Sequence, residues 1–453
     1  MTRKSGLIEF TIEEVEFPNK GKGTYEGIEV RVKGGIKGQK VRARVNRKRK
    51  DYIEAKIVDV IERSPLEKNL TNIDESGSCT YETLLYEDEL KLKEEQVLQL
   101  FEKAGFIDIN FLGIEPSPKV EGYRNKMEYT FGDEEKGGPL VLGLHKKGSF
   151  YSIVDSDGCN LVDEDFTDIR KTVMHYFREL GTSYYHKNTH EGFLRHLVIR
   201  KALSTGEILV NLVTSSQGEL DKEAFVNRLL NVNIKGRIVG ILHTINDSLS
   251  DVVKADKLEL LYGRDYIIEE ILGLKFSISP FSFFQTNTFG AERLYSIVRE
   301  FAGDIDDKIV FDLYSGTGTI AQIMAAVAKK VVGIEIVEEA VEKARENAKL
   351  NNLDNVEFIA GDVLKAVDEL EEKPDLIVID PPRDGIHPKA INKIIDFKPE
   401  RYVYVSCNPV TLVRDLKVFV ERGYKIEKVK CMDMFPRTPH VETVVLLSNN
   451  NSR

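Results

Sequence analysis

The chain has few cysteines and no long apolar run. Its 453 residues include only four cysteines, too few and too widely separated for a disulfide framework, so we expect reduced thiols. No apolar stretch approaches the roughly 20 residues that cross a bilayer, and the first residues lack the continuous apolar core of a secretion signal. These absences predict a cytoplasmic protein without a membrane segment.

The chain also has no overall excess of positive charge. Lys and Arg number 64 against 74 Asp and Glu, and the resulting net charge of −10 argues against binding nucleic acid over the whole surface. The charge is unevenly distributed, because residues 33–50 hold nine Lys or Arg and no acid. Such a run is often only a solvated face, but on a small separate module it can contact phosphates.

At this length we expect two or three domains. Residues 1–62 alternate polar and apolar side chains in short runs separated by glycine, which predicts a small antiparallel β-barrel. Residues 63–272 mix strand patterns with helix patterns, such as the amphipathic stretch 164–180, and predict an α+β segment.

The last segment, residues 273–453, has a more regular pattern. From Ile309 on, apolar strands alternate with amphipathic helices, which is typical of a parallel, doubly wound α/β sheet. Two final strand patterns, at 424–434 and 440–448, have no helix between them, so we expect them to pair antiparallel at the end of the sheet. The predicted fold class is therefore α/β.

A ligand crevice is predicted at one edge of this sheet. The stretch "FDLYSGTGTIAQ" combines a strand, a tight turn with Gly316 and Gly318, and a helix start. Glu335, Asp362 and Asp380 follow three successive strands, and their carboxylates suit ribose hydroxyls, an adenine amine and a cationic centre. These features favour S-adenosylmethionine. The spacing of the glycines also fits the pattern of a dinucleotide-binding turn, so an enzyme that uses a nicotinamide cofactor is an alternative. Each of the three acids, taken alone, is more often the N-cap of a helix than a ligand contact.

One cysteine stands out by its position. Cys407 follows the strand after Asp380, at the edge where the crevice is expected, whereas a core thiol would sit in the middle of a strand. The preceding "DPP" loop, beginning at Asp380, is rigid and resembles the loop that holds a planar base in many nucleic-acid methyltransferases. Cys407 is thus a candidate nucleophile.

Five motifs together resemble one family. "FFQTN", "DLYSGTGTI", "DPPRDG", "SCNP" and "HVETV" occur in the order found in the RumA/TrmA family of RNA uracil-5-methyltransferases, and the likeness covers essentially the whole chain. The resemblance implies a TRAM domain of OB type at 1–62, a central RNA-binding domain at 63–272 and a Rossmann-like methyltransferase domain at 273–453. It also implies that residues of about 90–120 pack on the catalytic domain.

The resemblance further implies roles for single residues. Cys407 is expected to be the nucleophile and Glu442 the general base that removes the C5 proton. Independently of the resemblance, the chemistry suggests a role for Arg383, which lies beside the "DPP" loop and is expected to stabilise an enolate oxygen or to bind phosphate. The residues expected to contact S-adenosylmethionine are Gln285, Tyr314, Gly316, Glu335, Asp362 near the adenine, and Asp380.

The chain departs from the family at a cysteine motif. Many relatives hold an iron–sulfur cluster with four cysteines, but here Leu70 and Ser76 stand at two of those positions, and only Cys79 and Cys159 remain. Two thiolates are too few for such a cluster, so we expect no iron–sulfur cluster and no other metal.

The RNA target is predicted from the domain layout. An N-terminal barrel joined to a methyltransferase resembles the ribosomal branch of the family, which favours 23S ribosomal RNA and a protein that acts as a monomer. The alternatives are a tRNA uridine enzyme, an RNA cytosine C5-methyltransferase and a non-catalytic RNA-binding assembly factor. The cytosine enzymes usually carry a second cysteine in the "DPP" loop, which is absent here, and an assembly factor has no need of Cys407 or Glu442.

Overall fold

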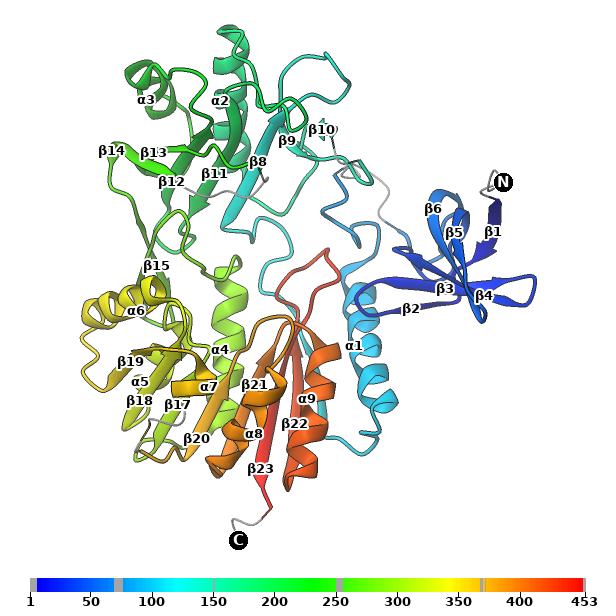
Figure 1. The fold of residues 1–453 in the computed structure, drawn as a ribbon, viewed down its shortest axis with the longest axis vertical. Helices are drawn as coiled ribbons and strands as arrows, with labels where there is room; N and C mark the ends of the chain where they lie inside the picture. Colours follow the sequence, from blue (N-terminus) through cyan, green and yellow to red (C-terminus); the bar gives the residue numbers. More distant parts are fainter. Residues whose placement is uncertain are drawn as a thin grey trace.

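A computed structural model of the protein describes residues 6–68, 76–149, 151–249, 256–366, 370 and 372–450. These residues form a six-stranded, a seven-stranded and an eight-stranded sheet and one two-stranded hairpin. In Figure 1 the N-terminal sheet lies at the side of the molecule, the central sheet at the top and the largest sheet at the bottom. None of the helices in the described ranges combines the length and apolar character that a bilayer crossing requires.

The N-terminal sheet is built from residues that alternate between buried and exposed positions. Inward side chains such as Phe10, Val30 and Val41 meet in one apolar core, while the outward positions are mostly charged. The strand order is β1-β5-β6-β4-β3-β2. The strands are β1 (Leu7–Thr11), β2 (Glu14–Glu16), β3 (Lys20–Tyr25), β4 (Ile28–Lys33), β5 (Lys40–Lys48) and β6 (Tyr52–Glu62).

The central sheet has the order β10-β9-β8-β11-β12-β13-β14. Its middle strands β11 and β12 are buried along their whole length, and the helices α2 and α3 meet through tilted aromatic rings, including Phe177 and Phe225, whose ring centres lie 5.8 Å apart. The strands are β8 (Lys126–Gly132), β9 (Val141–His145), β10 (Ile153–Val154), β11 (Leu194–Lys201), β12 (Glu207–Thr214), β13 (Arg237–Ile245) and β14 (Lys257–Gly263); the helices are α2 (Glu164–Glu179) and α3 (Lys222–Leu230).

The largest sheet has the order β19-β18-β17-β20-β21-β23-β22-β7, in which β7 is the strand Phe111–Glu115. Its first five strands are parallel. The last two strands of the chain pair antiparallel with each other, as the sequence predicts, but β23 lies between β21 and β22, and β22 is not the edge of the sheet because β7 pairs with it. The strands are β17 (Ile309–Leu313), β18 (Lys330–Glu335), β19 (Val356–Ala360), β20 (Leu376–Ile379), β21 (Arg401–Ser406), β22 (Tyr424–Met432) and β23 (Glu442–Asn449). The chain order reverses between β17 and β20, the place where open α/β sheets bind ligands.

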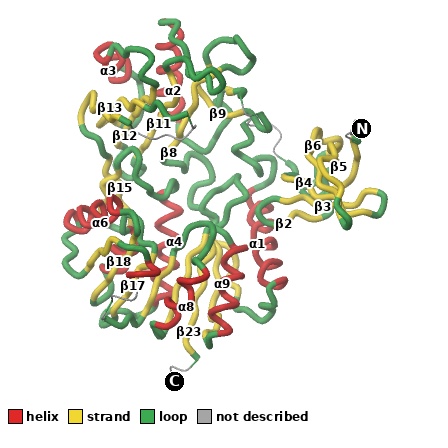
Figure 2. The backbone as a smooth tube through the Cα atoms, in the orientation of Figure 1, coloured by secondary structure: helices red, strands yellow, loops and turns green. Residues whose placement is uncertain are grey.

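Helices cover both faces of this sheet, as the tube in Figure 2 shows. One apolar core joins it to α4 (Thr288–Ala302), α5 (Thr319–Ala325) and α6 (Glu338–Leu350), and a second joins it to α8 (Pro388–Asp396) and α9 (Pro409–Glu421). The one-turn helix α7 (Val363–Ala366) follows β19. The hairpin of β15 (Ile267–Ile271) and β16 (Leu274–Ile278) connects the central sheet to α4.

Two elements from before the central sheet complete the largest sheet. The strand β7 (Phe111–Glu115) pairs in parallel with β22 at the edge. The helix α1 (Tyr86–Lys103) packs Val97 and Phe101 into the same core as α9, and it lies between this sheet and the N-terminal sheet in Figure 1. On its other side, the Gln96 amide donates to the carbonyl of Val15 at 3.1 Å.

Candidate functional site

The glycine turn after β17 has the backbone conformation that its residues predict. Gly316 and Gly318 have positive φ angles of 56° and 75°, and a Cβ on Gly318 would come within 2.6 Å of the Phe358 ring. The Gly316 N–H donates to the Glu335 carboxylate at 2.9 Å. Tyr314, also at positive φ (67°), is half-buried, and burial with the nearby charge of Asp362 raises its pKa to about 12. The turn is thus held against the end of β18.

Two of the predicted acids bind backbone N–H groups in this structure. Glu335 accepts from Gly316 and, through its other oxygen, from Val337 at 3.0 Å. Asp362 accepts from Leu364 at 3.0 Å and so caps the short helix α7. Carboxylate oxygens have further lone pairs, and both acids stay partly exposed at the same edge, so these contacts leave capacity for a ligand.

One further acid in this region was missed by the sequence reasoning. Asp312, on β17 in the "FDLYSG" stretch, is fully buried, and the nearby Ser315 side chain and Ala321 backbone act to lower its pKa, but neither of its oxygens meets hydrogen-bond geometry with a partner among the described residues. Burial raises its pKa to about 8. Its position two residues before the turn was the available signal. A buried acid without a partner beside a strand-end crevice fits a site that receives a polar or cationic ligand.

The "DPP" loop is fixed against the start of α9. Asp380 follows β20 and keeps part of its surface exposed, but its carboxylate lies deep enough that burial raises its pKa to about 7. The carbonyl of Arg383 accepts from the Asn408 amide at 2.9 Å and from the Thr411 hydroxyl at 3.2 Å. Asn408 also caps α9 by accepting from Val410. The "NP" that follows Cys407 therefore starts a helix and holds the loop.

Cys407 and Glu442 lie at the same edge on neighbouring strands. The register between the antiparallel strands β21 and β23 pairs Ser406 with Thr443. Cys407, the residue after Ser406, therefore stands opposite Glu442, the residue before Thr443. Burial and the charges of Glu442 and Asp380 raise the pKa of Cys407 to about 12, while Arg383 opposes this shift. Burial and Asp380 raise the pKa of Glu442 to about 8. The Cys407 thiol, the Glu442 and Asp380 carboxyl groups and the Arg383 guanidinium are therefore close enough to shift one another's pKa values in a partly desolvated site.

The "FFQTN" segment lies between α4 and the central sheet. Gln285 is half-buried, and its carbonyl accepts from the Asn125 amide at 2.9 Å. Asn287 caps α4 and donates to the carbonyl of Met434 at 2.8 Å. Phe283, which the sequence reasoning did not select, is 74% exposed although it is a large apolar residue, and its carbonyl accepts from Thr317 in the glycine turn at 3.4 Å.

The two cysteines left from the cluster motif are buried. Cys79 and Cys159 belong to the apolar core of the central sheet, together with Tyr123 and Tyr129. Ser76 contacts Ser78, and Leu70 lies outside the described residues. In the ranges that the structure describes, no group of three or more His, Cys, Asp or Glu side chains is arranged to hold a metal ion. The absence of an iron–sulfur cluster stays a prediction.

The fold and the strand-end crevice define a class of protein. Five parallel strands with an antiparallel β23 inserted before β22, and carboxylates after successive strands, form the Rossmann-like fold of S-adenosylmethionine-dependent methyltransferases. The residues present fit this cofactor. The two glycines of the turn have no side chains that would keep a ligand from the backbone, and the acids can accept hydrogen bonds from hydroxyl groups and attract a cation.

Comparison with known proteins identifies the family. The sequence profile described as tRNA (Uracil-5-)-methyltransferase matches residues 248–450. Proteins of Clostridium tetani and Caldanaerobacter subterraneus, both named as uncharacterized RNA methyltransferases, are 56% and 54% identical and align with 99% of this chain and with 99% and 100% of their own length. The chain belongs to the same family as these RNA methyltransferases, and the predicted enzyme class, an RNA methyltransferase that uses S-adenosylmethionine, is confirmed.

A solved structure is similar over nearly the whole chain. The Pyrococcus abyssi tRNA (uracil-54, C5)-methyltransferase, in complex with S-adenosyl-L-homocysteine, covers 97% of this chain and 100% of its own at 29% identity and a TM-score of 0.76. This similarity confirms the predicted α/β methyltransferase fold.

Proposed function

We propose that this enzyme methylates uridine C5 in RNA by covalent catalysis, with Cys407 as the nucleophile and Glu442 as the general base. The observation that carries the proposal is the register between β21 and β23, which leads a thiol and a carboxylate to one edge beside Asp380 and Arg383. The thiol can attack the base as a nucleophile and the carboxylate can remove a proton, and these are the two roles that the reaction requires beside the cofactor crevice.

The reaction needs the thiol because uracil C5 is a poor nucleophile. The Cys407 thiol gives its proton to solvent, the thiolate bonds to C6, and the electrons of the C5–C6 double bond move to give an enolate with carbanion character at C5. C5 would then bond to the methyl group that bound S-adenosylmethionine supplies, while the bond from that methyl group to the sulfonium sulfur breaks and S-adenosylhomocysteine leaves. Glu442 removes the C5 proton, the C5–C6 double bond forms again, and the bond from C6 to sulfur breaks to return the Cys407 thiolate.

The surroundings of the two groups support these roles. With a pKa of about 8, Glu442 in its ionised form is a stronger base than an ordinary carboxylate, which suits it to take a proton from carbon. Arg383 lowers the pKa of Cys407 against the opposing effect of burial, and its charge can offset an enolate oxygen or bind phosphate. The target base must leave its stack to reach C6, and the exposed ring of Phe283 offers a surface on which a base can stack.

The cofactor contacts proposed here follow the crevice. Tyr314, Gly316 and Glu335 line the turn after β17, and Asp362 lies beyond the next strand, where the adenine is expected. Further residues proposed to contact S-adenosylmethionine are Gln285 and Asp380.

We further propose 23S ribosomal RNA as the target, bound by the central domain and by a TRAM domain at residues 1–62. The combination of an N-terminal β-domain with the methyltransferase supports this choice. A second candidate is tRNA, which one observation favours: the Pyrococcus abyssi enzyme is described as acting on tRNA uracil 54 and is similar over 97% of this chain. Mapping 5-methyluridine in both RNAs from a strain without the gene decides between them.

Two substitutions test the covalent mechanism. Cys407→Ala should abolish methyl transfer, whereas Glu442→Gln should allow attack and methylation but stop proton removal. The Glu442→Gln enzyme should therefore stay attached to its RNA as an adduct that survives denaturation and requires both S-adenosylmethionine and Cys407. RNA with 5-fluorouridine should trap the wild-type enzyme in the same way, because fluorine cannot leave as a proton.

A matched control is available for the thiol. Cys159 is also a cysteine but lies in the core of the central sheet, so Cys159→Ala should form the adduct normally. Normal turnover by Glu442→Gln, or activity in Cys407→Ala, would show that the proposed roles are wrong.

A further inference from the structure

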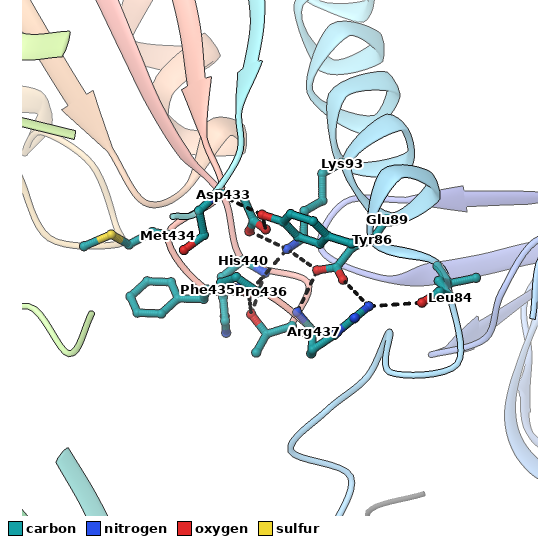
Figure 3. A network of polar contacts seen from close by, with 12 residues as sticks. Leu84, Tyr86, Glu89, Lys93, Asp433, Met434, Phe435, Pro436, Arg437 and His440 are labelled. Atoms are coloured by element: carbon teal, nitrogen blue, oxygen red, sulfur yellow. Dashed lines mark hydrogen bonds and ion pairs between the residues drawn. The ribbon is translucent and has the colours of Figure 1, made fainter. Parts of the chain in front are cut away.

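A buried cluster of charged side chains links α1 to the segment between β22 and β23. Lys93 is fully buried, and its ammonium contacts Glu89 and Asp433, each at 2.7 Å. The Tyr86 hydroxyl donates to Asp433 at 2.9 Å, and the guanidinium of Arg437 lies 3.4 Å from Glu89. Figure 3 shows these side chains between the helix and the segment. Two cations and two carboxylates thus neutralise one another in the protein interior.

The cluster also binds the backbone of this segment. The Lys93 ammonium donates to the carbonyl of Phe435 at 3.3 Å, and the N–H of Arg437 donates to Glu89 at 2.7 Å. The guanidinium of Arg437 donates to the carbonyl of Leu84 at 3.0 Å. Each of these bonds has a fixed direction, so together they set where the segment runs as well as how tightly it packs.

Three other parts of the chain hold the same segment. The Tyr123 hydroxyl donates to the carbonyl of Pro436 at 3.0 Å, and the N–H of Tyr81 donates to the carbonyl of Arg437 at 3.0 Å. Asn287, from the "FFQTN" motif, donates to the carbonyl of Met434 at 2.8 Å. Residues 433–438 are therefore anchored from α1, from the chain before the central sheet and from the start of α4.

The anchored segment leads directly to Glu442. In the register between β22 and β23, Met432 pairs with Glu442, and Asp433 is the next residue after Met432. At the other end of the segment, His440 lies 3.2 Å from Arg383 and two residues before Glu442. A shift of the Asp433 anchor must therefore move the backbone on which Glu442 stands.

We propose that Lys93, with Glu89 and Asp433, forms a positioning device that keeps Glu442 in register with Cys407. Buried ion clusters add little net stability compared with apolar packing, but they specify one arrangement because each partner must be satisfied. This inference rests on the roles proposed above for Cys407 and Glu442. None of the three residues needs to touch RNA or cofactor.

The proposal predicts a defect confined to the second half of the reaction. Lys93→Met keeps the length of the side chain but leaves the two carboxylates without their shared cation. Displacement of a catalytic group by about 1 Å can cost about a hundredfold in rate, so we expect kcat to fall by roughly ten- to a hundredfold. The KM for S-adenosylmethionine should not change, and the denaturation-resistant adduct with RNA should accumulate, as for Glu442→Gln.

A matched control separates positioning from loss of stability. Lys201 is also a lysine held between two carboxylates, contacting Asp165 at 2.6 Å and Asp163, but it belongs to the central sheet. Lys201→Met should lower the melting temperature similarly without adduct accumulation. If Lys93→Met does not fold, Tyr86→Phe removes a single hydroxyl from the cluster and should raise the adduct fraction in the same direction by a smaller factor.

The outcomes are distinguishable. The positioning role is overturned if Lys93→Met and Lys201→Met give equal adduct fractions. Tyr86→Phe takes the place of Lys93→Met in this comparison if the latter does not fold. A fall in kcat without adduct accumulation would overturn the role as well. If the wild-type enzyme itself produces 5-methyluridine without any trappable adduct, the covalent mechanism fails, and the positioning proposal fails with it. If only the Lys93 result is negative, the covalent mechanism stands and the inference from the cluster alone is wrong.

Discussion

A guanidinium nitrogen of Arg383 lies 3.2 Å from Nδ1 of His440. Because arginine can only donate, Nδ1 must accept, and the neutral ring then carries its proton on Nε2. Burial, helped by the charge of Arg383, lowers the pKa of His440 to about 4, so the ring stays neutral near physiological pH. Arg383 is thus the cation that faces both this ring and the Cys407 thiol.

The first prediction concerns the reactivity of Cys407 in the RNA-free enzyme. With a pKa of about 12, the thiol should react slowly with iodoacetamide near neutral pH, and its rate should rise about tenfold per pH unit as the thiolate fraction grows. Arg383→Ala removes the group that lowers this pKa and should slow the reaction further. Cys407→Ala gives the background from the other thiols. Fast, pH-independent labelling at neutral pH would contradict the prediction.

The second prediction concerns the pH dependence of cofactor binding. Burial raises the pKa of Asp380 to about 7 and that of Asp312 to about 8, so both hold protons at mildly acidic pH. A positively charged sulfonium favours their ionised forms, so S-adenosylmethionine should bind more tightly as the pH rises from about 6 to about 8, with release of protons. Calorimetry in buffers of different ionisation enthalpy measures that release.

The product of methyl transfer supplies the control for this experiment. S-adenosylhomocysteine lacks the sulfonium charge, so its affinity should change less over the same pH range. Asp380→Asn should flatten the dependence for S-adenosylmethionine. Parallel pH profiles for the two ligands would argue that the sulfonium does not interact with these acids.

The third prediction concerns the basic stretch 33–50. Three of its cations form ion pairs, namely Lys40 with Glu62, Arg42 with Glu9 and Arg49 with Glu54. The other six basic residues make no ion pair within the described part of the chain, and they include Arg47 and Lys48. Removing residues 1–62 should weaken RNA binding and leave the affinity for S-adenosylmethionine nearly intact.

Point substitutions sharpen this test, because α1 also contacts the N-terminal sheet. Replacing Arg47 and Lys48 by alanine should reduce the slope of log K against log salt by about 0.7 to 0.9 for each phosphate that the protein no longer neutralises. Arg42→Ala, which removes an already paired cation, should leave the slope unchanged. Identical slopes for all forms would mean that the stretch is only a solvated face.

The fourth prediction concerns metal content. Protein purified without oxygen should be colourless and contain no stoichiometric iron, since only Cys79 and Cys159 remain of the expected ligands. Iron and sulfide analysis, with absorbance spectra, measures this directly. About four iron atoms per chain would show that other residues complete a cluster.

The sequence predicts the order of strands and helices after Ile309 well, because strand and helix periods differ clearly and each parallel connection needs a helix. Because the ends of parallel strands meet at one edge, the sequence alone predicts that Glu335, Asp362 and Asp380 lie at the same edge of the sheet. It does not predict the distances between them. The pairing of β7 with β22 could not be derived in this way, since the two strands are far apart in the chain and nothing in either pattern specifies its partner.

The charged cluster on α1 was missed for a different physical reason. The helical period of this stretch predicts one buried face with Leu90, Val97, Leu98 and Phe101, and it leaves the charged positions to solvent. The structure does bury Val97 and Phe101, but it also buries Glu89 and Lys93 completely, whereas Leu90 and Leu98 are only partly covered. Burial of a charge depends on partners brought by the fold, here Asp433 and Arg437, which no local pattern can reveal.

The position of β7 and α1 has a consequence for how the protein is made. The ribosome synthesises both elements before the central sheet, but their partners, β22 and the segment after it, are among the last parts to emerge. For most of translation, the apolar side of α1 with Val97 and Phe101 therefore lacks the side chains of α9 and of the largest sheet that complete its core, and β7 has no strand to pair with. Such late, long-range pairing slows folding and exposes nascent chains to aggregation or chaperones. Translation that stops before β22 should thus yield a chain that lacks both the methylation chemistry and a stable place for its first helix.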